Sequence, residues 1–364
     1  MAQGRPTVDE LIALGLYDPD GELASERLAL IEYLLDLGAT VDELVAAYPD
    51  LAVVASTRAL RGPGALLTES ELAARAGVPI ETSARVWRAA GFPDPGPGAR
   101  IFSEEEAEAL RIYQAAADWL GEDVVLQVVR VIGSSMARIA DAAIAAFLVN
   151  VGGPALADDP GGLALARANT EAVALLRGAS EVLDVIFLRH VEALQRPVNP
   201  GDQTTQELTV GFADLVGSTA LAQRLSIREL GTALAEFDEL TADVVVDAGG
   251  RVVKLIGDEV MYVAPAPGTG CEIALRLSER FSDHPRLPPV RGGLAHGSVL
   301  TRDGDYFGPV VNLASRTIKL AAPSAVLAAA TVRAAADGYQ FTSIGSPELK
   351  GFEVPIELFE VRRR

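Results

Sequence analysis

The chain has 364 residues, of which 49% are hydrophobic, and it carries a formal net charge of -19. This length is enough for two hydrophobic cores, so we expect two domains. The acidic balance disfavours binding to the phosphate backbone of nucleic acids, and the single cysteine, Cys271, excludes a disulfide within this sequence.

Residues 1–195 predict an all-helical domain, because their apolar residues recur at spacings of three and four. Within them, TESELAARAGVPIETSARVWRAAGF (68–92) combines a Thr-x-x-Glu capping box, a glycine turn and a second short helix. It resembles the helix-turn-helix of bacterial regulators, in which Arg85 and Arg88 would face DNA. The acidic flanks favour a packing role, so we expect no nucleic acid partner.

Two longer stretches, residues 124–151 and 163–195, predict helices that are apolar over more than one face. We expect them to form an intersubunit core, with an apolar ligand in this domain as the alternative. The most apolar window, 138–153, has polar interruptions and is shorter than the ~20 residues of a membrane span, so we expect no span. The N-terminus lacks a signal-peptide pattern, and we expect a cytoplasmic protein.

The character of the sequence changes at residues 196–206, which are polar, contain two prolines and predict a linker. From 207 to 364, β-type runs alternate with helical stretches. The second part is therefore predicted to be an α/β domain.

Two acidic residues follow β-type runs in this second domain. In LTVGFADLVGSTALAQ (208–223) an apolar strand ends at Asp214, and in GGRVVKLIGDEVMYVAP (249–265) a Gly-Asp hairpin places Asp258 at a strand end. If the strands are neighbours, the two carboxylates converge, and hard oxygen ligands suit magnesium or manganese. Taken singly, each aspartate could instead cap a helix or serve a turn.

A third segment, DGDYFGPVVNLASRTIKLA (303–321), predicts a turn and then a helix with Asn312 and Arg316 on one face. A solvated helix face is the plain interpretation. However, apolar residues surround Asn312, and an amide beside a guanidinium suits a sugar and a phosphoryl group.

In chain order, ELTVGFADLVGST, RVVKLIGDEVMYV, GLAHGSVLTRDGDYFGPVVNLASR and LKGFEVPIELFEVRR resemble the catalytic domain of class III nucleotidyl cyclases. The helical first half resembles the regulatory domain of the acid-stimulated mycobacterial adenylyl cyclases. The resemblance implies a two-domain α+β protein, with an all-helical regulatory domain (1–195) and a ferredoxin-like, palm-type α/β catalytic domain (207–364). It also implies the conversion of ATP to 3',5'-cyclic AMP and pyrophosphate.

Carried over to this sequence, the resemblance implies that two divalent ions, Mg²⁺ or Mn²⁺, are bound by Asp214, Asp258 and the backbone carbonyl of Leu215. The ions would serve the ribose 3'-hydroxyl and the triphosphate. In this family the metal aspartates and the Asn/Arg pair come from opposite subunits. A homodimer with two sites is therefore implied.

The same resemblance assigns the remaining contacts to the substrate. Lys254 and Asp305 would read the purine, Asn312 would orient the ribose, and Arg316 would stabilise charge on the α-phosphoryl group. By residue type alone, a lysine and an aspartate could serve adenine or, in a shifted register, guanine. The resemblance favours adenine, because the lysine precedes the Gly-Asp hairpin as in adenylyl cyclases.

Regulation is expected through the helical domain, by pH or by a lipid. His190 is the candidate pH sensor, because histidine changes its charge near physiological pH. Alternatively, His190 has only a packing role, or clustered carboxylates sense the acid. Two other functions stay open at this point. One is a nucleotide-binding signalling module without turnover, and the other is a nucleotide-controlled DNA-binding regulator.

Overall fold

The computed structural model describes residues 5–61, 64–195 and 205–364. The chain divides into two compact units, Met1–Arg196 and Pro197–Arg364, each with its own cores. The predicted linker lies outside the described residues up to position 204. Its last two residues begin the first strand of the second unit.

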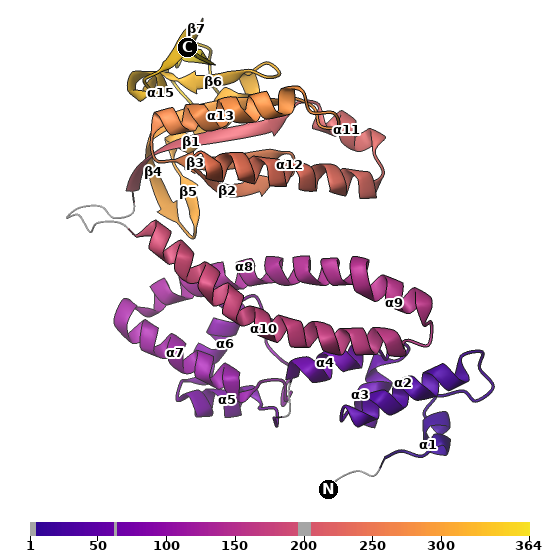
Figure 1. Cartoon of the computed structure of the whole chain (residues 1–364). Helices are drawn as coiled ribbons and strands as arrows, with labels where there is room; N and C mark the ends of the chain where they lie inside the picture. The colour runs from indigo at the N-terminus through magenta and orange to yellow at the C-terminus, as the bar shows by residue number, and fades with distance from the viewer. Residues whose placement is uncertain (1–4, 62–63, 196–204) are drawn as a thin grey trace. The chain divides into compact units, whose positions relative to one another are not determined.

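The first unit is built from helices, as the apolar spacing predicts, and Figure 1 shows their succession along the chain. Its elements are α1 (Val8–Ala13), α2 (Ala24–Asp36), α3 (Val41–Ala47), α4 (Val53–Arg61), α5 (Glu69–Ala76), α6 (Ile80–Ala89), α7 (Glu104–Leu120), α8 (Glu122–Phe147), the π-helical turn η1 (Leu148–Gly152), α9 (Gly153–Asp158) and α10 (Leu163–Leu194). The predicted capping boxes begin α5 at Thr68 and α7 at Ser103. Gly77 ends α5 with a φ of 74°, which only glycine adopts at low cost.

Two apolar clusters stabilise this unit. The first joins α2, α3 and α4 to the start of α10 around Leu30, Ile31 and Leu44. The second joins α5, α6, α7 and the start of α8 around Leu72 and Leu110. Both clusters take the apolar positions that the helical period brings to one face.

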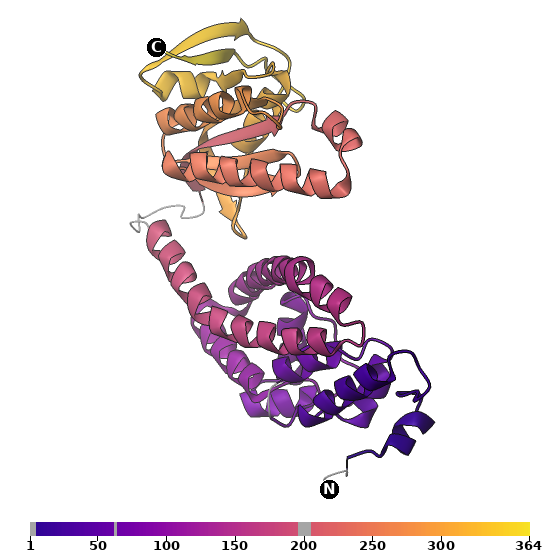
Figure 2. The ribbon, with the colours of Figure 1, turned by 45° about the vertical axis from the view of Figure 1, so that its right-hand side comes forward.

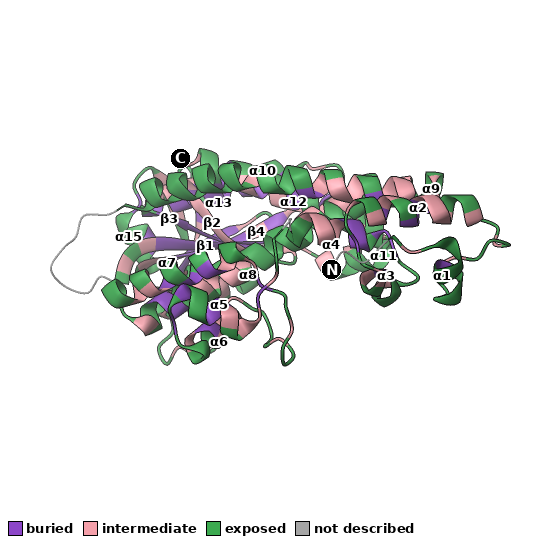
Figure 3. Cartoon of the chain, turned by 90° about the horizontal axis from the view of Figure 1, so that it is seen from below, coloured by how far each residue is buried: buried purple, intermediate pink, exposed green. Residues whose placement is uncertain are grey.

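The later parts of α8 and α10 lack such cover within the described chain. Large apolar side chains of both helices are exposed, among them Ile132 and Ile144 of α8 and Leu175, Val185 and Phe187 of α10. Figure 3 shows most of both helices as exposed. Within the described residues of the first unit, these apolar faces are left uncovered.

One helical segment, Glu122–Asp158, is long and apolar enough to cross a membrane by length and composition, and 6% of its most apolar window is buried. The sequence prediction considered a shorter window, because the continuation of α8 through η1 into α9 was not foreseen. The expected absence of a membrane span therefore stays a prediction.

The second unit is the predicted α/β domain. Its elements are β1 (Thr205–Leu215), α11 (Ser218–Arg224), α12 (Ile227–Asp247), β2 (Arg251–Ile256), β3 (Glu259–Ala264), α13 (Pro267–Ser282), β4 (Val290–Arg302), β5 (Asp305–Phe307), α14 (Pro309–Thr317), the 3-10 helix η2 (Ile318–Leu320), β6 (Val326–Ala329), α15 (Ala330–Ala335), β7 (Tyr339–Gly345) and β8 (Leu358–Arg363). The strands form one sheet in the order β2-β3-β1-β4-β6-β8-β7, and β5 pairs with β4. Among the strand pairs of the described residues, β4 and β6 run parallel and the others are antiparallel.

The sheet has an apolar cluster on each face. Alternate residues of β1 face opposite sides, so Ala213 and Leu215 join the cluster with α12 and α13, while Val210 and Phe212 join the cluster with α14. Figures 1 and 2 show α12 and α13 lying together on one face. By the same alternation, Asp214 belongs to the α14 face. The single cysteine, Cys271, is buried on the other face, where burial raises the pKa of its thiol to about 12.

One glycine fixes how closely the α14 face approaches the sheet. A Cβ built on Gly293 of β4 would lie 2.4 Å from the backbone nitrogen of Ile318, the first residue of η2. The backbone of η2 can rest against β4 only because no side chain lies between them.

We therefore expect Gly293→Ala to push η2 away and to lower the free energy of unfolding by about 1–3 kcal/mol, measured by denaturant melting. Gly231→Ala in α12 is the matched control, because a Cβ there meets no atom within 4 Å. That change should stabilise the helix by about 0.5–1 kcal/mol. Equal free energies of unfolding for the two variants would show that the close approach at Gly293 does not contribute to stability.

Candidate active site

Asp214 lies near the end of β1, between two neighbouring strands. Its register partners are Glu259 of β3 on one side and Arg291 of β4 on the other. The carboxylate is buried, and Arg291 donates to its Oδ2 from Nε at 2.9 Å and from Nη2 at 2.6 Å. The apolar run before Asp214 thus ends in a buried carboxylate with a charged partner.

Asp258 reaches the same place through the predicted hairpin. Gly257, with a φ of 67°, and Asp258 connect β2 to β3. The backbone N–H of Leu215 donates to the carbonyl of Asp258 at 3.0 Å, which ties the hairpin to the end of β1. The expected convergence of the two aspartates is therefore present in the structure.

Both aspartates line a pocket of about 430 Å³. Its other lining residues are Leu215, Gly217, Ser218, Thr219, Ile256, Glu259, Arg291 and Lys319. The glycine, serine and threonine behind Asp214 line the pocket as Gly217, the N-cap of α11, and as Ser218 and Thr219 of its first turn. Most of the residues that line the pocket are charged or polar.

Three charged residues of this pocket were missed in the sequence. Arg291 and Lys319 are cations facing Asp214, and Glu259 is the carboxylate next to Asp258. Arg291 lies 77 positions from Asp214 in sequence, so only the β1–β4 register brings them together. For Glu259 a signal existed, because it directly follows the Gly-Asp hairpin.

The donor set suits a hard divalent cation. Oδ2 of Asp214 is held by Arg291, while Oδ1 accepts no hydrogen bond from the residues that the structure describes. Asp258 and Leu215 line the same pocket. Among the described residues, no three His, Cys, Asp or Glu side chains form a complete metal site. The chain thus offers the carboxylates of two aspartates at one pocket, which are oxygen ligands of the kind that Mg²⁺ and Mn²⁺ accept.

The two residues predicted to bind the purine form an ion pair with each other within one chain. Lys254 of β2 donates to Oδ2 of Asp305, the first residue of β5. The other oxygen of Asp305 accepts the N–H of Tyr306 at 2.8 Å. A cation and an anion are therefore presented side by side, both partly exposed.

The predicted ribose and phosphoryl residues lie on α14. Asn312 and Arg316 are one helical turn apart, and both are exposed. Apolar neighbours Val310, Leu313 and Ala314 pack toward the sheet and leave the two polar side chains outside. The helix thus displays an amide and a guanidinium on its outer side.

The predicted site residues fall into separate groups within one chain. Lys254, Asp305, Asn312 and Arg316 are not among the described residues that line the pocket at Asp214. The geometry of a single chain therefore assembles the carboxylates without the predicted base, sugar and phosphoryl contacts.

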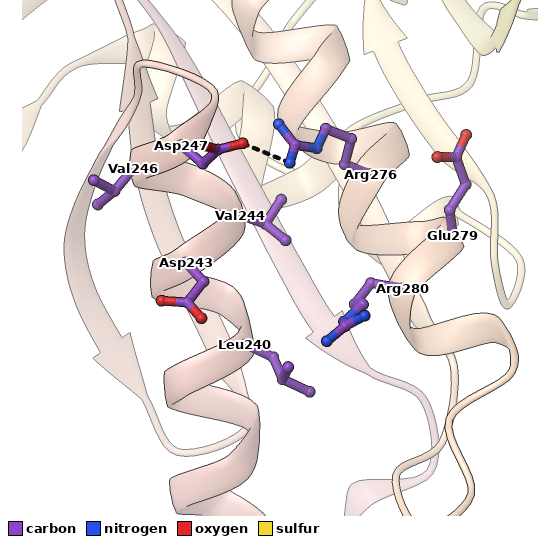
Figure 4. A pocket seen from close by; sticks show the side chains of 8 residues that line it. All are labelled: Leu240, Asp243, Val244, Val246, Asp247, Arg276, Glu279 and Arg280. Atoms are coloured by element: carbon purple, nitrogen blue, oxygen red, sulfur yellow. Dashed lines mark hydrogen bonds and ion pairs between the residues drawn. The ribbon is translucent and has the colours of Figure 1, made fainter.

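A larger pocket, of about 820 Å³, lies between α12 and α13. Figure 4 shows Arg276 of α13 reaching Asp247 of α12, and their ion pair measures 2.7 Å. This pocket is on the face of the sheet opposite Asp214, because α12 and α13 pack against Ala213 and Leu215. It holds none of the predicted catalytic groups.

In the first unit, the helix-turn-helix-like segment forms α5 and α6. Arg85 pairs with Glu122 at 2.7 Å, and Arg88 pairs with Asp94 at 2.9 Å. Guanidinium groups paired with carboxylates are poor phosphate ligands, which agrees with the expected packing role. The candidate sensor His190 is exposed on α10, and no hydrogen bond to it is found within the described parts of the chain.

Comparison with known families matches both halves. Residues 6–190 match the adenylate cyclase regulatory domain, and residues 201–361 match the adenylate and guanylate cyclase catalytic domain. The second unit is thus a class III cyclase catalytic domain, joined to a helical cyclase regulatory domain.

Similar proteins extend this match over the whole chain. A pH-sensitive adenylate cyclase of Mycobacterium tuberculosis is 34% identical over 98% of this chain and 92% of its own length. An adenylate cyclase of Streptomyces coelicolor is 39% identical over 71% of this chain and 69% of its own. The chain belongs to this family of adenylate cyclases with an N-terminal regulatory domain, and it is an adenylate cyclase.

Solved structures that match part of this chain include the adenylyl cyclase CyaB from P. aeruginosa, with 23% identity and a TM-score of 0.38. That match covers 44% of this chain and 96% of the other. A bacterial light-regulated adenylyl cyclase has 19% identity and a TM-score of 0.44, covering 52% and 64%.

Proposed function

We propose that this adenylate cyclase converts ATP to 3',5'-cyclic AMP and pyrophosphate at two sites shared between the subunits of a homodimer. One observation carries the proposal: Asp214 and Asp258 converge at one pocket, while Asn312 and Arg316 stand exposed elsewhere on the same chain. A complete site requires both sets, and a second copy can bring the missing one.

In the proposed reaction the ribose 3'-hydroxyl loses its proton to solvent and its oxygen bonds to the α-phosphorus. The bond from that phosphorus to the bridging oxygen breaks, and pyrophosphate leaves with that oxygen. Asp214, Asp258 and the Leu215 carbonyl would hold two Mg²⁺ or Mn²⁺ ions, which would supply Lewis-acid stabilisation to the attacking and departing oxygens. Arg291 lines the same pocket. Once Asp214 binds a metal ion, the Arg291 guanidinium would be free to donate to phosphate oxygens.

The second copy contributes the groups that position the substrate. Arg316 stabilises negative charge on the α-phosphoryl group, and Asn312 holds the ribose. The Lys254 ammonium donates to N1 of adenine, and the Asp305 carboxylate accepts from its 6-amino group. The ion pair between Lys254 and Asp305 keeps both groups in place before the base arrives.

Removing one metal carboxylate tests the catalytic assignment. We expect Asp258→Ala to lower cyclic AMP formation roughly a hundredfold or more with either Mg²⁺ or Mn²⁺. Asp243→Ala, which removes a carboxylate from the α12–α13 pocket, should keep the wild-type rate. Tight ATP binding by the wild type without cyclic AMP formation would favour the alternative of a silent nucleotide-binding module.

Mixing two inactive variants tests the sharing of sites. Asp258→Ala and Arg316→Ala homodimers should both be inactive. Random exchange makes half of the dimers mixed, and each mixed dimer has one intact site, so activity should return to about a quarter of the wild-type rate. Mixed dimers shown by light scattering to form, but without recovered activity, would place all the residues of a site in one subunit.

We further propose that the exposed apolar faces of α8 and α10 pack against the second copy, with a lipid as the alternative occupant. His190 lies on α10, and its neighbours one helical turn away are apolar, including Phe187 and Leu194. Protonation of His190 would place a charge within that interface. The N-terminal domain would thereby respond to acid, in a cytoplasmic protein without a membrane span.

Activity measured from pH 5 to 8 tests this regulation. We expect a step in the wild-type profile, with activity rising as pH falls, because a charge in the α10 interface would release the restraint that the helical domain places on the catalytic domains. His190→Gln should lose the step, while Arg189→Gln, an adjacent exposed change, should keep it. A step that persists in His190→Gln would assign the response to carboxylates.

A further inference from the structure

Lys319 is a charged residue of the Asp214 pocket to which the proposed reaction gives no role. It belongs to η2, directly after the helix that carries Arg316. Its Nζ lies 2.7 Å from Oε2 of Glu259 and 3.9 Å from Oδ2 of Asp214. One ammonium group thus stands beside two carboxylates of neighbouring strands.

The two carboxylates need this cation because of the strand register. Asp214 and Glu259 lie directly opposite each other on β1 and β3, and like charges in that position repel. Their side chains are only 8% and 15% exposed, so water screens the repulsion weakly. Arg291 lies on the far side of Asp214, in β4, and binds Asp214. Lys319 therefore supplies the counter-charge on the Glu259 side.

The position of Lys319 also opposes a divalent cation. An ion bound at Asp214 and Asp258 would enter the pocket that the ammonium group lines, and like charges in a partly buried site repel strongly. Lys319 also engages the Glu259 carboxylate, which would otherwise be free to act as a third acidic ligand. Both effects lower the affinity of the pocket for a cation that arrives alone.

We propose that Lys319 is a positioning residue that holds Asp214 and Glu259 in place without metal and keeps divalent affinity low until the nucleotide arrives. The negative charge of the triphosphate then offsets the ammonium group, so that cation and nucleotide load together. The inference rests on the proposed metal role of Asp214 and Asp258.

The test is Mn²⁺ binding to the nucleotide-free, full-length protein, followed by the electron paramagnetic resonance signal of free Mn²⁺. Lys319→Met should bind Mn²⁺ about three- to tenfold more tightly than the wild type, the range of a partly exposed charge pair. Lys319→Arg, which keeps the charge, should stay within about twofold. Arg276→Met is the matched control, because it removes a cation paired with Asp247 on the opposite face.

A double variant separates the two effects. If Glu259 becomes a ligand once released, Glu259→Gln added to Lys319→Met should remove most of the gain in Mn²⁺ affinity. Circular dichroism melting of each variant establishes that the proteins compared are folded.

Unchanged or weaker Mn²⁺ binding by Lys319→Met would overturn the inference. If ATP binding without metal also falls in that variant, Lys319 is a phosphate ligand instead. Asp258→Asn in the same assay distinguishes this failure from failure of the metal site. Loss of Mn²⁺ binding in Asp258→Asn with no change in Lys319→Met refutes only the role of Lys319, whereas equal binding by wild type and Asp258→Asn refutes both.

Discussion

The register of β1 between β3 and β4 is the constraint on which the site depends. It sets Glu259, Asp214 and Arg291 in one row across three strands. A slip of one residue would turn Asp214 toward α12 and α13, among the buried side chains of Phe237 and Tyr262. A charge there would have no partner, so burial on both faces of the sheet holds the carboxylate in the pocket.

Because η2 lies close against β4, the segment formed by α14 and η2 presents charged side chains in two directions. Gly293 lets the backbone at Ile318 rest on the sheet, and Lys319 then reaches inward to Glu259. One turn earlier, Arg316 points outward from α14. The same short segment therefore serves the pocket of its own chain and, in the proposed homodimer, that of the second copy. A shift of this segment would change both sites together.

The sequence was sufficient for the parts of the fold that local chemistry determines. The capping boxes at Thr68 and Ser103, the Gly-Asp hairpin and the turn before α14 depend on residues a few positions apart. The row of charges at Asp214 was not predictable in this way. It joins strands distant in sequence, and its members are identified only when the register is known. Arg291 follows two prolines at the start of a β-run, where nothing local indicates its partner.

A net charge of -19 opposes the approach of a substrate as anionic as ATP, so the positions and partners of the cations determine how the nucleotide is attracted. The sequence contains three lysines, all in the catalytic unit, and two of them, Lys254 and Lys319, belong to the predicted site or its pocket. Both are paired with a carboxylate, as is Arg291. A cation that is paired with a carboxylate attracts free phosphate only weakly. The site therefore attracts the nucleotide weakly, as the acidic chain as a whole does. In the proposed mechanism, affinity for the nucleotide would depend on cations that exchange carboxylate partners when a metal ion binds. Binding of the metal–nucleotide complex would then be more favourable than binding of either component alone.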